Sequence, residues 1–263
     1  QSREASERLR AGPLLSATVS GGNRSALAGG TRVCVTGASG FIGLHIVDAL
    51  LARGCHVKAT VRDASHSRKL APLLAMQHGA QCGSLELVGG CDLLSLGSFD
   101  DAVADCEVCF HVASPFWMDD RITDPQRELI APAEKGTFNV LSSCAKAKNM
   151  RRVVVTSSFA AVMNVGGHNP WPMDFRYDEQ HWNVSSSPVN GIFPEPQNVH
   201  AYRWSKAVAE KTAWAFVQIH KPRFDITCLL PPMVLGWNKQ KLTSVADLNQ
   251  SSFIIFKMLS GQM

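Results

Sequence analysis

The segment VCVTGASGFIG, residues 33–43, is the feature that most narrows what this chain can fold into. Three glycines, Gly37, Gly40 and Gly43, stand three residues apart, and an apolar run lies on each side of them. Glycine lets the backbone turn sharply and come close to another group. The first run has the length of a buried strand and the second the length of a helix. The glycines are therefore expected to form the turn that opens a βαβ unit.

Short apolar runs and amphipathic stretches keep alternating along the chain. Strands are predicted at residues 31–37, 56–62, 85–90, 107–114, 151–158 and 225–230, and helices at residues 41–54, 67–79, 98–105, 124–149 and 201–220. Pro132 is expected to bend or break the helix at 124–149, because its ring clashes with the preceding helical turn. Strands that are apolar on both faces and alternate with helices predict an α/β fold, a doubly wound parallel sheet of the Rossmann type.

The two ends of the chain and one internal region do not follow this alternation of strands and helices. Residues 1–30 are rich in Ser, Arg, Ala and Gly and are expected to be a disordered lead-in, or else a targeting segment, against which Glu4 and Glu7 count. Residues 164–198 read as a loop rich in Pro, Asn, Gly, Trp and Ser. Residues 236–263 begin polar and end in a predicted helix near 251–261.

Charge and hydropathy exclude two classes of partner. The formal net charge is +4, and no basic block or stripe is present, which argues against nucleic acid. No apolar run approaches the roughly 18 residues of a membrane span, so no membrane partner is expected. A cytoplasmic location follows, with organelle import by the N-terminal segment as the alternative.

The eight cysteines are interpreted as buried small hydrophobic residues, since most of them lie in apolar runs. Cys106 and Cys109 form one C-x-x-C pair, which falls in a predicted strand where positions three apart point to opposite faces. A second ligand pair of matching spacing is missing from the sequence. No metal site is therefore predicted.

The glycine-rich turn indicates a dinucleotide site. The open N–H groups at the start of a helix attract an anion, and a strand, a glycine turn and a helix in this order are typical of pyrophosphate binding. The candidate cofactor residues of this turn are Gly37, Ser39, Gly40, Phe41, Ile42 and Gly43. Arg62, at the end of the second predicted strand, suits a 2′-phosphate and, with Lys69, favours NADP over NAD. The alternatives are a merely tight turn and ordinary solvated charges.

A second constellation carries the candidate chemistry. Tyr202 and Lys206 stand at i and i+4 of a predicted helix and so share one face. Ser157 and Ser158 end the fifth predicted strand, at the carboxyl edge where such sheets bind ligands. A nearby cation favours the phenolate, so Lys206 and an oxidised nicotinamide ring are both expected to lower the pKa of Tyr202. The alternatives are an ordinary helix face and a strand cap.

TGASGFIG, Tyr202-x-x-x-Lys206 and the strand-ending TSS together resemble the extended short-chain dehydrogenases/reductases. The runs VRD, CDLLSLGSFDDAV, FHVASP, DEQHWN and SKAVAEKTAWAF are similar to the group of dihydroflavonol 4-reductases, cinnamoyl-CoA reductases and yeast-type aldehyde/ketone reductases. The likeness spans roughly residues 31–260. It implies an NADP-binding Rossmann domain at 31–235 and the start of a small substrate-binding part, apparently truncated, at 236–263.

The resemblance also implies roles. Ser158 matches the family's catalytic serine, Tyr202 the acid that protonates the carbonyl oxygen, and Lys206 the residue that lowers the pKa of the tyrosine and holds the ribose. Further matches are Asp92 and Leu93 around the adenine, Val112, Ala113 and Ser114 near the ribose and phosphates, Pro231 and Val234 beside the nicotinamide, and Asn164, with Ser114 and Ser158, near the substrate.

The function implied is an NADP-dependent reductase that passes a hydride to an aldehyde or ketone. Its substrate would be a medium-sized, partly aromatic carbonyl compound, and the chain would be a monomer or homodimer. Trp171, Phe175, Trp182 and Phe193 either line the substrate pocket or form a satellite core. His200 stands where cinnamoyl-CoA reductases carry Asn, and a surface histidine is the default expectation.

Two other functions stay open at this stage. The first is a sugar-nucleotide epimerase or dehydratase on the same scaffold, which Arg62 opposes because those enzymes commonly keep NAD. The second is a non-catalytic NADP-binding sensor, although such proteins tend to lose the tyrosine and lysine that are both present here.

Overall fold

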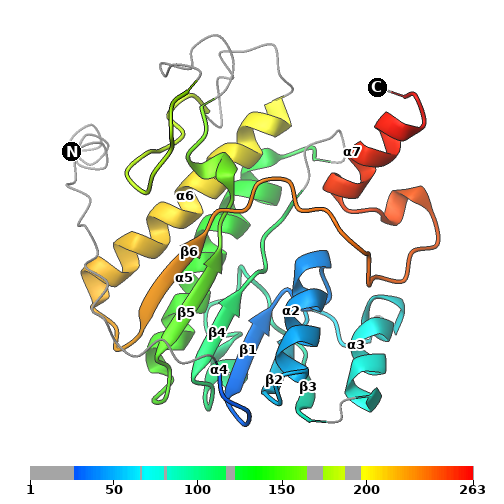
Figure 1. The fold of residues 1–263 in the computed structure, drawn as a ribbon. Coiled ribbons are helices and arrows are strands. Elements are labelled where there is room, and N and C mark those ends of the chain that lie inside the picture. The colour runs from blue at the N-terminus through cyan, green and yellow to red at the C-terminus, as the bar shows by residue number, and fades with distance from the viewer. Residues whose placement is uncertain are drawn as a thin grey trace.

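The computed structural model describes residues 27–65, 67–79, 82–116, 122–164, 174–186 and 197–262. Within them, six parallel strands form one sheet in the order β3-β2-β1-β4-β5-β6 (Figure 1). The strands are β1 (Arg32–Thr36), β2 (His56–Thr60), β3 (Ser84–Val88), β4 (Val108–His111), β5 (Arg152–Thr156) and β6 (Asp225–Leu229). The predicted doubly wound parallel sheet is thereby confirmed.

Helices cover both faces of the sheet. They are α2 (Phe41–Leu51), α3 (Ser67–Gly79), α4 (Asp100–Val103), α5 (Ala131–Lys146), α6 (Gln197–His220) and α7 (Gln250–Leu259). Alternate strand residues point to opposite faces, so Val33 and Val35 pack in one buried cluster with α2 and α3, whereas Cys34 packs in another with α4, α5 and α6. Both faces of β1 are therefore core, which explains its uninterrupted apolar sequence.

The strand order fixes where a ligand can enter. From β1 the chain moves outward through β2 to β3, and then returns to place β4 on the other side of β1. The loops that leave the carboxyl ends of β1 and β4 consequently run in opposite directions. A crevice opens at such a switch point, which is where open α/β sheets bind their ligands.

Pro132 interrupts its helix as expected. A π-helical turn, Gln126–Ile130, precedes α5, and the Ala131 N–H donates to the carbonyl of Gln126, five residues back. Pro132 then falls in the first turn of α5. Pro132 has no N–H to donate to a carbonyl one turn earlier, so the wider π-helical turn stands where a regular α-helical ladder would be broken.

Several local predictions need correction. The helix expected at 98–105 is regular only over α4, and α6 begins four residues before the expected position 201. Cys106 lies in the turn before β4, so it shares a buried cluster with Cys109 and does not point to the opposite face. The buried residues of α2 are Gly43, Leu44, Val47, Leu50 and Leu51, while the equally apolar Ile42 and Ile46 are only half-buried.

Other predictions fall partly outside the described residues, including most of the lead-in at 1–30 and much of the loop at 164–198. The structure describes residues 164, 174–186 and 197–198 of that loop. The first two parts contain no helix or strand, whereas residues 197–198 already belong to α6. No helix within the described part of the chain is long and apolar enough to cross a membrane. Nor do the described residues bring three or more His, Cys, Asp or Glu side chains together as a metal-binding group.

The segment that follows β6 crosses the carboxyl ends of the strands and reaches α7 on the side of α2 and α3 (Figure 1). Ion pairs and hydrogen bonds tie it there. Lys239 pairs with Asp48 at 2.9 Å, and Arg68 pairs with Asp247 at 3.5 Å and donates to the Thr243 hydroxyl at 3.1 Å. His45 Nε2 is hydrogen-bonded to the Trp237 carbonyl (2.7 Å), and Gln240 Nε2 donates to the Ser39 carbonyl (3.4 Å).

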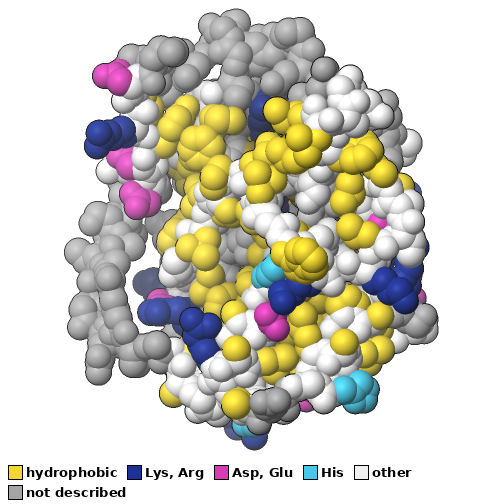
Figure 2. All heavy atoms as spheres, turned by 45° about the vertical axis from the view of Figure 1, so that its right-hand side comes forward, with side chains coloured by type: hydrophobic (Ala, Val, Ile, Leu, Met, Phe, Trp, Pro, Cys, Tyr) yellow, Lys and Arg dark blue, Asp and Glu magenta, His cyan; other side chains and the backbone are white. Residues whose placement is uncertain are grey.

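Hydrophobic side chains spread over the face of the molecule on which this segment lies (Figure 2). Among those of the segment, Leu235, Val245 and Met258 are exposed, and Trp237 keeps 82% of its surface accessible. The segment is thus held by polar contacts and leaves apolar groups outside.

Candidate active site

A cavity of about 760 Å³ opens at the switch point, within the usual size range of ligand sites. Nearly all the residues predicted from the sequence line it. They are Gly37, Ser39, Gly40, Phe41, Ile42, Gly43, Arg62, Asp92, Leu93, Val112, Ala113, Ser114, Ser158, Tyr202, Lys206, Pro231 and Val234. Of the predicted site residues, Lys69 and Asn164 lie outside this lining.

Two of the glycines are required by space, and one of them, Gly37, is also required by its conformation. Gly37 has φ +64°, and a Cβ atom there would lie 2.8 Å from the Cα of Ala113. A Cβ atom on Gly43 would lie 2.2 Å from the Gly37 carbonyl oxygen. The turn therefore packs too tightly for any side chain at these positions, and it holds β1, α2 and the segment after β4 against one another.

The start of α2 is open toward the cavity. Gly40 is its N-cap and offers no side-chain acceptor to the first amides. The N–H groups of Phe41, Ile42 and Gly43 have no carbonyl one turn earlier within the helix. All three residues line the cavity. These amides, with the positive end of the helix dipole, form a site suited to an anion such as a pyrophosphate.

A buried histidine holds the segment that faces this turn. The N–H groups of Val112 and Ala113 both donate to the Thr36 hydroxyl oxygen, each at 3.1 Å. With its oxygen so occupied, the Thr36 hydroxyl donates its proton to Nδ1 of His111 at 2.9 Å. The Thr137 hydroxyl lies 3.5 Å from His111 Nε2. This arrangement needs a neutral imidazole, and burial, with a smaller contribution from the Lys206 charge, lowers the pKa of His111 to about 4.

Ser158, Tyr202 and Lys206 meet at the other end of the cavity. Ser158 follows β5 in extended conformation, and its hydroxyl is hydrogen-bonded to the Tyr202 phenol. The Lys206 ammonium lies one helical turn along α6, 5.7 Å from the centre of the Tyr202 ring. The structure thus brings together the three residues that the sequence proposed as one group.

The part of the expected pKa lowering that rests on Lys206 is wrong, because burial and not the lysine charge determines the pKa of Tyr202. Burial raises the pKa of Tyr202 to about 12, and the hydrogen bond to Ser158 opposes this only in part. Burial also lowers the pKa of Lys206 to about 8. Both shifts have one cause, because a site this dry disfavours each charged form. The phenol is therefore neutral at physiological pH and carries a proton that it can donate.

The wall beside the phenol is apolar. The Phe116 ring lies 5.0 Å from that of Tyr202, and Ile122 packs in the same cluster. Both residues line the cavity. The aromatic residues proposed for this wall lie elsewhere, insofar as the structure describes them. Phe175 packs edge-to-face on Tyr177, and Trp182 lies under the Lys211 ammonium, so the partners of these two lie outside the cavity lining. Trp171 and Phe193 are outside the described residues.

Asn164 holds a loop. Its side-chain carbonyl accepts hydrogen bonds from the N–H groups of Val184 (2.8 Å) and Ser185 (3.1 Å), and it is buried. Lys69 is exposed on α3. The expectation of a surface histidine at position 200 is wrong, because His200 is fully buried in α6.

Comparison with known proteins places the chain in a family. A model of the 3-beta hydroxysteroid dehydrogenase/isomerase family matches residues 34–263, which include the glycine turn and the Ser158, Tyr202 and Lys206 cluster. The chain belongs to this family.

Individual proteins similar to this chain belong to the reductase group that the sequence resembles. Cinnamoyl-CoA reductase CAD2 of Medicago truncatula is 41% identical over 232 residues, covering 88% of this chain and 65% of the relative. Dihydroflavonol 4-reductase of Arabidopsis thaliana is 39% identical over 204 residues, covering 78% and 49%. The chain therefore spans about half to two thirds of the length of these relatives.

Solved structures give the same result. Yeast methylglyoxal/isovaleraldehyde reductase Gre2, solved with NADPH, superposes with a TM-score of 0.71 at 31% identity, over 88% of this chain and 66% of that one. Gre2 of Candida albicans, also solved with NADPH, superposes with a TM-score of 0.66 at 31% identity, over 87% and 65%. The predicted membership in the extended reductase group is confirmed.

The resemblance assigned residues 236–263 to a substrate-binding part but named no residue of this segment as lining the cavity. Gln240 and residues 247–251, from the segment that crosses the strand ends and from the start of α7, also line the cavity. In the described part of the chain, the side-chain amide nitrogen of Asn249 and the amide oxygen of Gln250 are buried without a hydrogen-bond partner, as is the Ser114 hydroxyl. The sequence did not indicate which residues of this segment would face the cavity, because they are distant in sequence from the glycine turn.

Proposed function

We propose that this chain carries the NADP-dependent reduction of an aldehyde or ketone. The observation that supports it is a single cavity with an anion-binding helix start at one end and a hydrogen-bonded serine, phenol and buried ammonium at the other. Residues 31–235 supply the cofactor half, and residues 236–263 contribute to the substrate half.

The residues present fit a dinucleotide phosphate. The open amides of α2 suit its pyrophosphate, and the exposed guanidinium of Arg62 on the cavity wall suits a 2′-phosphate. The buried Ser114 hydroxyl, which lacks a partner among the described residues, offers a further donor in the same space. The yeast and Candida relatives solved with NADPH support NADP as the cofactor. When bound, NADPH supplies the hydride.

The chain's own groups handle the proton. Tyr202, neutral because burial raises its pKa to about 12, donates its proton to the carbonyl oxygen of the substrate. The Ser158 hydroxyl holds that oxygen by a hydrogen bond. The Lys206 ammonium stabilises the phenolate that remains and holds the ribose. Phe116 and Ile122 exclude water and favour a medium-sized, partly aromatic substrate.

The experiment combines binding and turnover. NADPH and NADH are titrated against the purified chain, and NADPH oxidation is then followed with aldehydes, ketones, dihydroflavonols and acyl-CoAs. We expect tighter binding of NADPH and turnover of at least one carbonyl class. The Tyr202→Phe variant should keep NADPH affinity and lose about 10²- to 10⁴-fold in kcat, the usual contribution of a general acid.

Tyr177→Phe is the matched control, because Tyr177 packs against Phe159 and Phe175 outside the cavity lining. It should keep full turnover. Undiminished turnover in Tyr202→Phe contradicts the assigned proton donor. NADPH binding without turnover of any substrate favours a cofactor-binding sensor, and a preference for NADH favours the epimerase class.

A further inference from the structure

The face of α6 that carries Tyr202 and Lys206 continues with two more residues at the same spacing, Glu210 and Trp214. Glu210 is only 6% exposed, and the proposed chemistry gives it no role. A carboxyl group is costly to bury unless hydrogen bonds satisfy it. Its contacts therefore indicate what it does for the site.

Both carboxyl oxygens of Glu210 face neutral donors. The Ser157 hydroxyl donates a short hydrogen bond to Oε2, and the Trp214 indole N–H donates to Oε1 at 3.3 Å. Cys228 of β6 lies close enough for the Glu210 charge to raise the pKa of its thiol further, beyond the effect of burial. Burial likewise raises the pKa of Glu210, against the effect of its two hydrogen bonds. The carboxyl group links the end of β5 to the middle of α6.

The linked residue is the immediate neighbour of the proposed catalytic serine. Ser157 turns the chain sharply at the end of β5, with its N–H donating to the Val155 carbonyl at 3.1 Å. Ser158 then extends, and its hydroxyl accepts from the Ala160 N–H at 3.2 Å and bonds to Tyr202. The Ser158 hydroxyl can reach the phenol only if the backbone at 157 keeps its place relative to α6.

We propose that Glu210 is a positioning residue, which holds Ser157 and thereby keeps the Ser158 hydroxyl on the Tyr202 phenol. The proposal rests on the proposed function for its kinetic consequence only. The alignment itself is a property of the free protein. The alternative is a carboxyl group that merely stabilises the packing of β5 on α6.

Ser157→Ala is the most direct variant, because it removes the link and leaves Glu210 bonded to Trp214. We expect kcat to fall about tenfold, with the KM for the carbonyl substrate and the NADPH affinity unchanged. Glu210→Ala should match it, and the double variant should be no worse than either single one, since all three remove the same link. Glu210→Gln should restore most of the activity, because its amide can still bond to the Ser157 hydroxyl.

Trp214→Phe is the matched control. It removes the other hydrogen bond of Glu210 and spares the link to Ser157. If Glu210 only stabilises packing, Trp214→Phe and Ser157→Ala should lower Tm and kcat alike. If Glu210 positions Ser158, only Ser157→Ala should lower kcat, at similar Tm.

A spectroscopic measurement decides the question even if the chain turns over no substrate. The chain contains two tyrosines, so 3-fluorotyrosine gives two ¹⁹F signals, which Tyr177→Phe assigns. We expect the Tyr202 signal to move in Ser157→Ala and Glu210→Ala and to stay in Glu210→Gln and Trp214→Phe. A Tyr202 signal unmoved in folded Ser157→Ala overturns the proposal, as does an equal movement in Trp214→Phe. Failure of the proposed function shows separately, as absent NADPH oxidation by the unmodified chain.

Discussion

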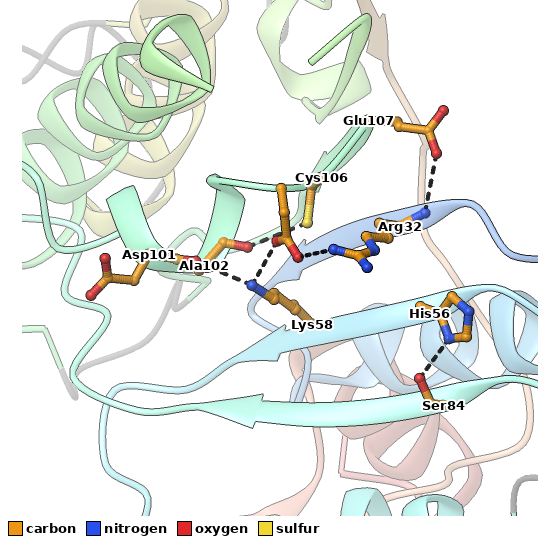
Figure 3. Close-up of polar contacts among 9 residues, drawn as sticks. Arg32, His56, Lys58, Ser84, Asp101, Ala102, Cys106 and Glu107 are labelled. Atoms are coloured by element: carbon orange, nitrogen blue, oxygen red, sulfur yellow. Dashed lines mark hydrogen bonds and ion pairs between the residues drawn. The ribbon is translucent and has the colours of Figure 1, made fainter. Parts of the chain in front are cut away.

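Polar groups differ between the two ends of the parallel strands, called here the amino edge and the carboxyl rim of the sheet. At the amino edge, Asp105 pairs with both Arg32 and Lys58, each at 2.6 Å. Lys58 also donates to the Asp101 carbonyl (Figure 3). The His56 ring bonds to Ser84 on the neighbouring strand. The hydrogen bond from Lys58, the largest influence, lowers the pKa of Asp105. Charges here are partly exposed and satisfied by each other.

At the carboxyl rim the polar groups are buried and several lack partners. Ser114, Asn249 and Gln250 each keep a buried polar atom that no described residue satisfies. Lys206 carries its charge in a dry cavity that lowers its pKa to about 8. A buried polar group without a hydrogen-bond partner lowers the stability of the fold. Proteins therefore keep such groups mainly where a ligand will bond to them. The contrast separates a structural edge from a binding edge without reference to any relative.

The largest expected effect is that of a methyl group in the phosphate-binding turn. Gly43→Ala places a Cβ atom 2.2 Å from the Gly37 carbonyl oxygen, so the turn must open. We expect NADPH affinity to fall by more than about a thousandfold, measured by fluorescence titration. Gly79→Ala is the control, because its added Cβ meets nothing within 4 Å. Equal affinity in the two variants would refute the role given to the turn.

The next effect is on acid stability. His111 has a pKa of about 4 in the folded chain and 6.5 as its reference value, so the folded state binds fewer protons between these values. The stability that the neutral ring provides is complete above pH 6.5 and is lost as the pH falls toward 4. We expect a loss of about 3 kcal/mol over this range. The free energy of unfolding of His111→Asn, measured with urea at each pH, should not show this loss, because asparagine does not titrate in this range. If it falls with pH as steeply as in the unmodified chain, the assignment to His111 is contradicted.

A smaller effect is expected at the 2′-phosphate. Arg62→Ala should lower NADPH affinity by about tenfold to a hundredfold, since a hydrogen bond to a charged group contributes about 1.5–3 kcal/mol. NADH affinity should hardly change, because NADH lacks this phosphate. Calorimetric titration with both cofactors measures the ratio. Lys69→Ala, made in parallel, tests whether the exposed lysine on α3 shares the phosphate, and an unchanged NADPH to NADH ratio in Arg62→Ala would remove the arginine from the site.

The smallest effect is expected at the opposite edge. Asp105→Asn weakens two partly exposed ion pairs and should cost less than about 1 kcal/mol of unfolding free energy, and less still at high salt. NADPH affinity and turnover should stay unchanged. A large loss of turnover in Asp105→Asn would break the division between a structural and a binding edge.

Local patterns predicted much of this molecule. The spacing of Gly37, Gly40 and Gly43 placed a turn between β1 and α2, and the i, i+4 pair of Tyr202 and Lys206 placed a phenol and an ammonium on one helix face. These two predictions succeed because a tight turn and the spacing of residues on a helix face depend only on residues close together in the sequence. The core face of α2 was harder to assign, since Ile42 and Ile46 are as apolar as Leu44 and Val47 and only packing distinguishes them.

The sequence by itself determined the alternation of strands and helices, the site of the glycine turn and the grouping of the candidate catalytic residues. Only the tertiary structure decided which distant segments complete the cavity, among them residues 247–251. It also decided that burial raises the pKa of Tyr202, and that Glu210 meets Ser157. Periodicity records interactions within a few residues, whereas desolvation and long-range hydrogen bonds depend on parts of the chain that only folding brings together.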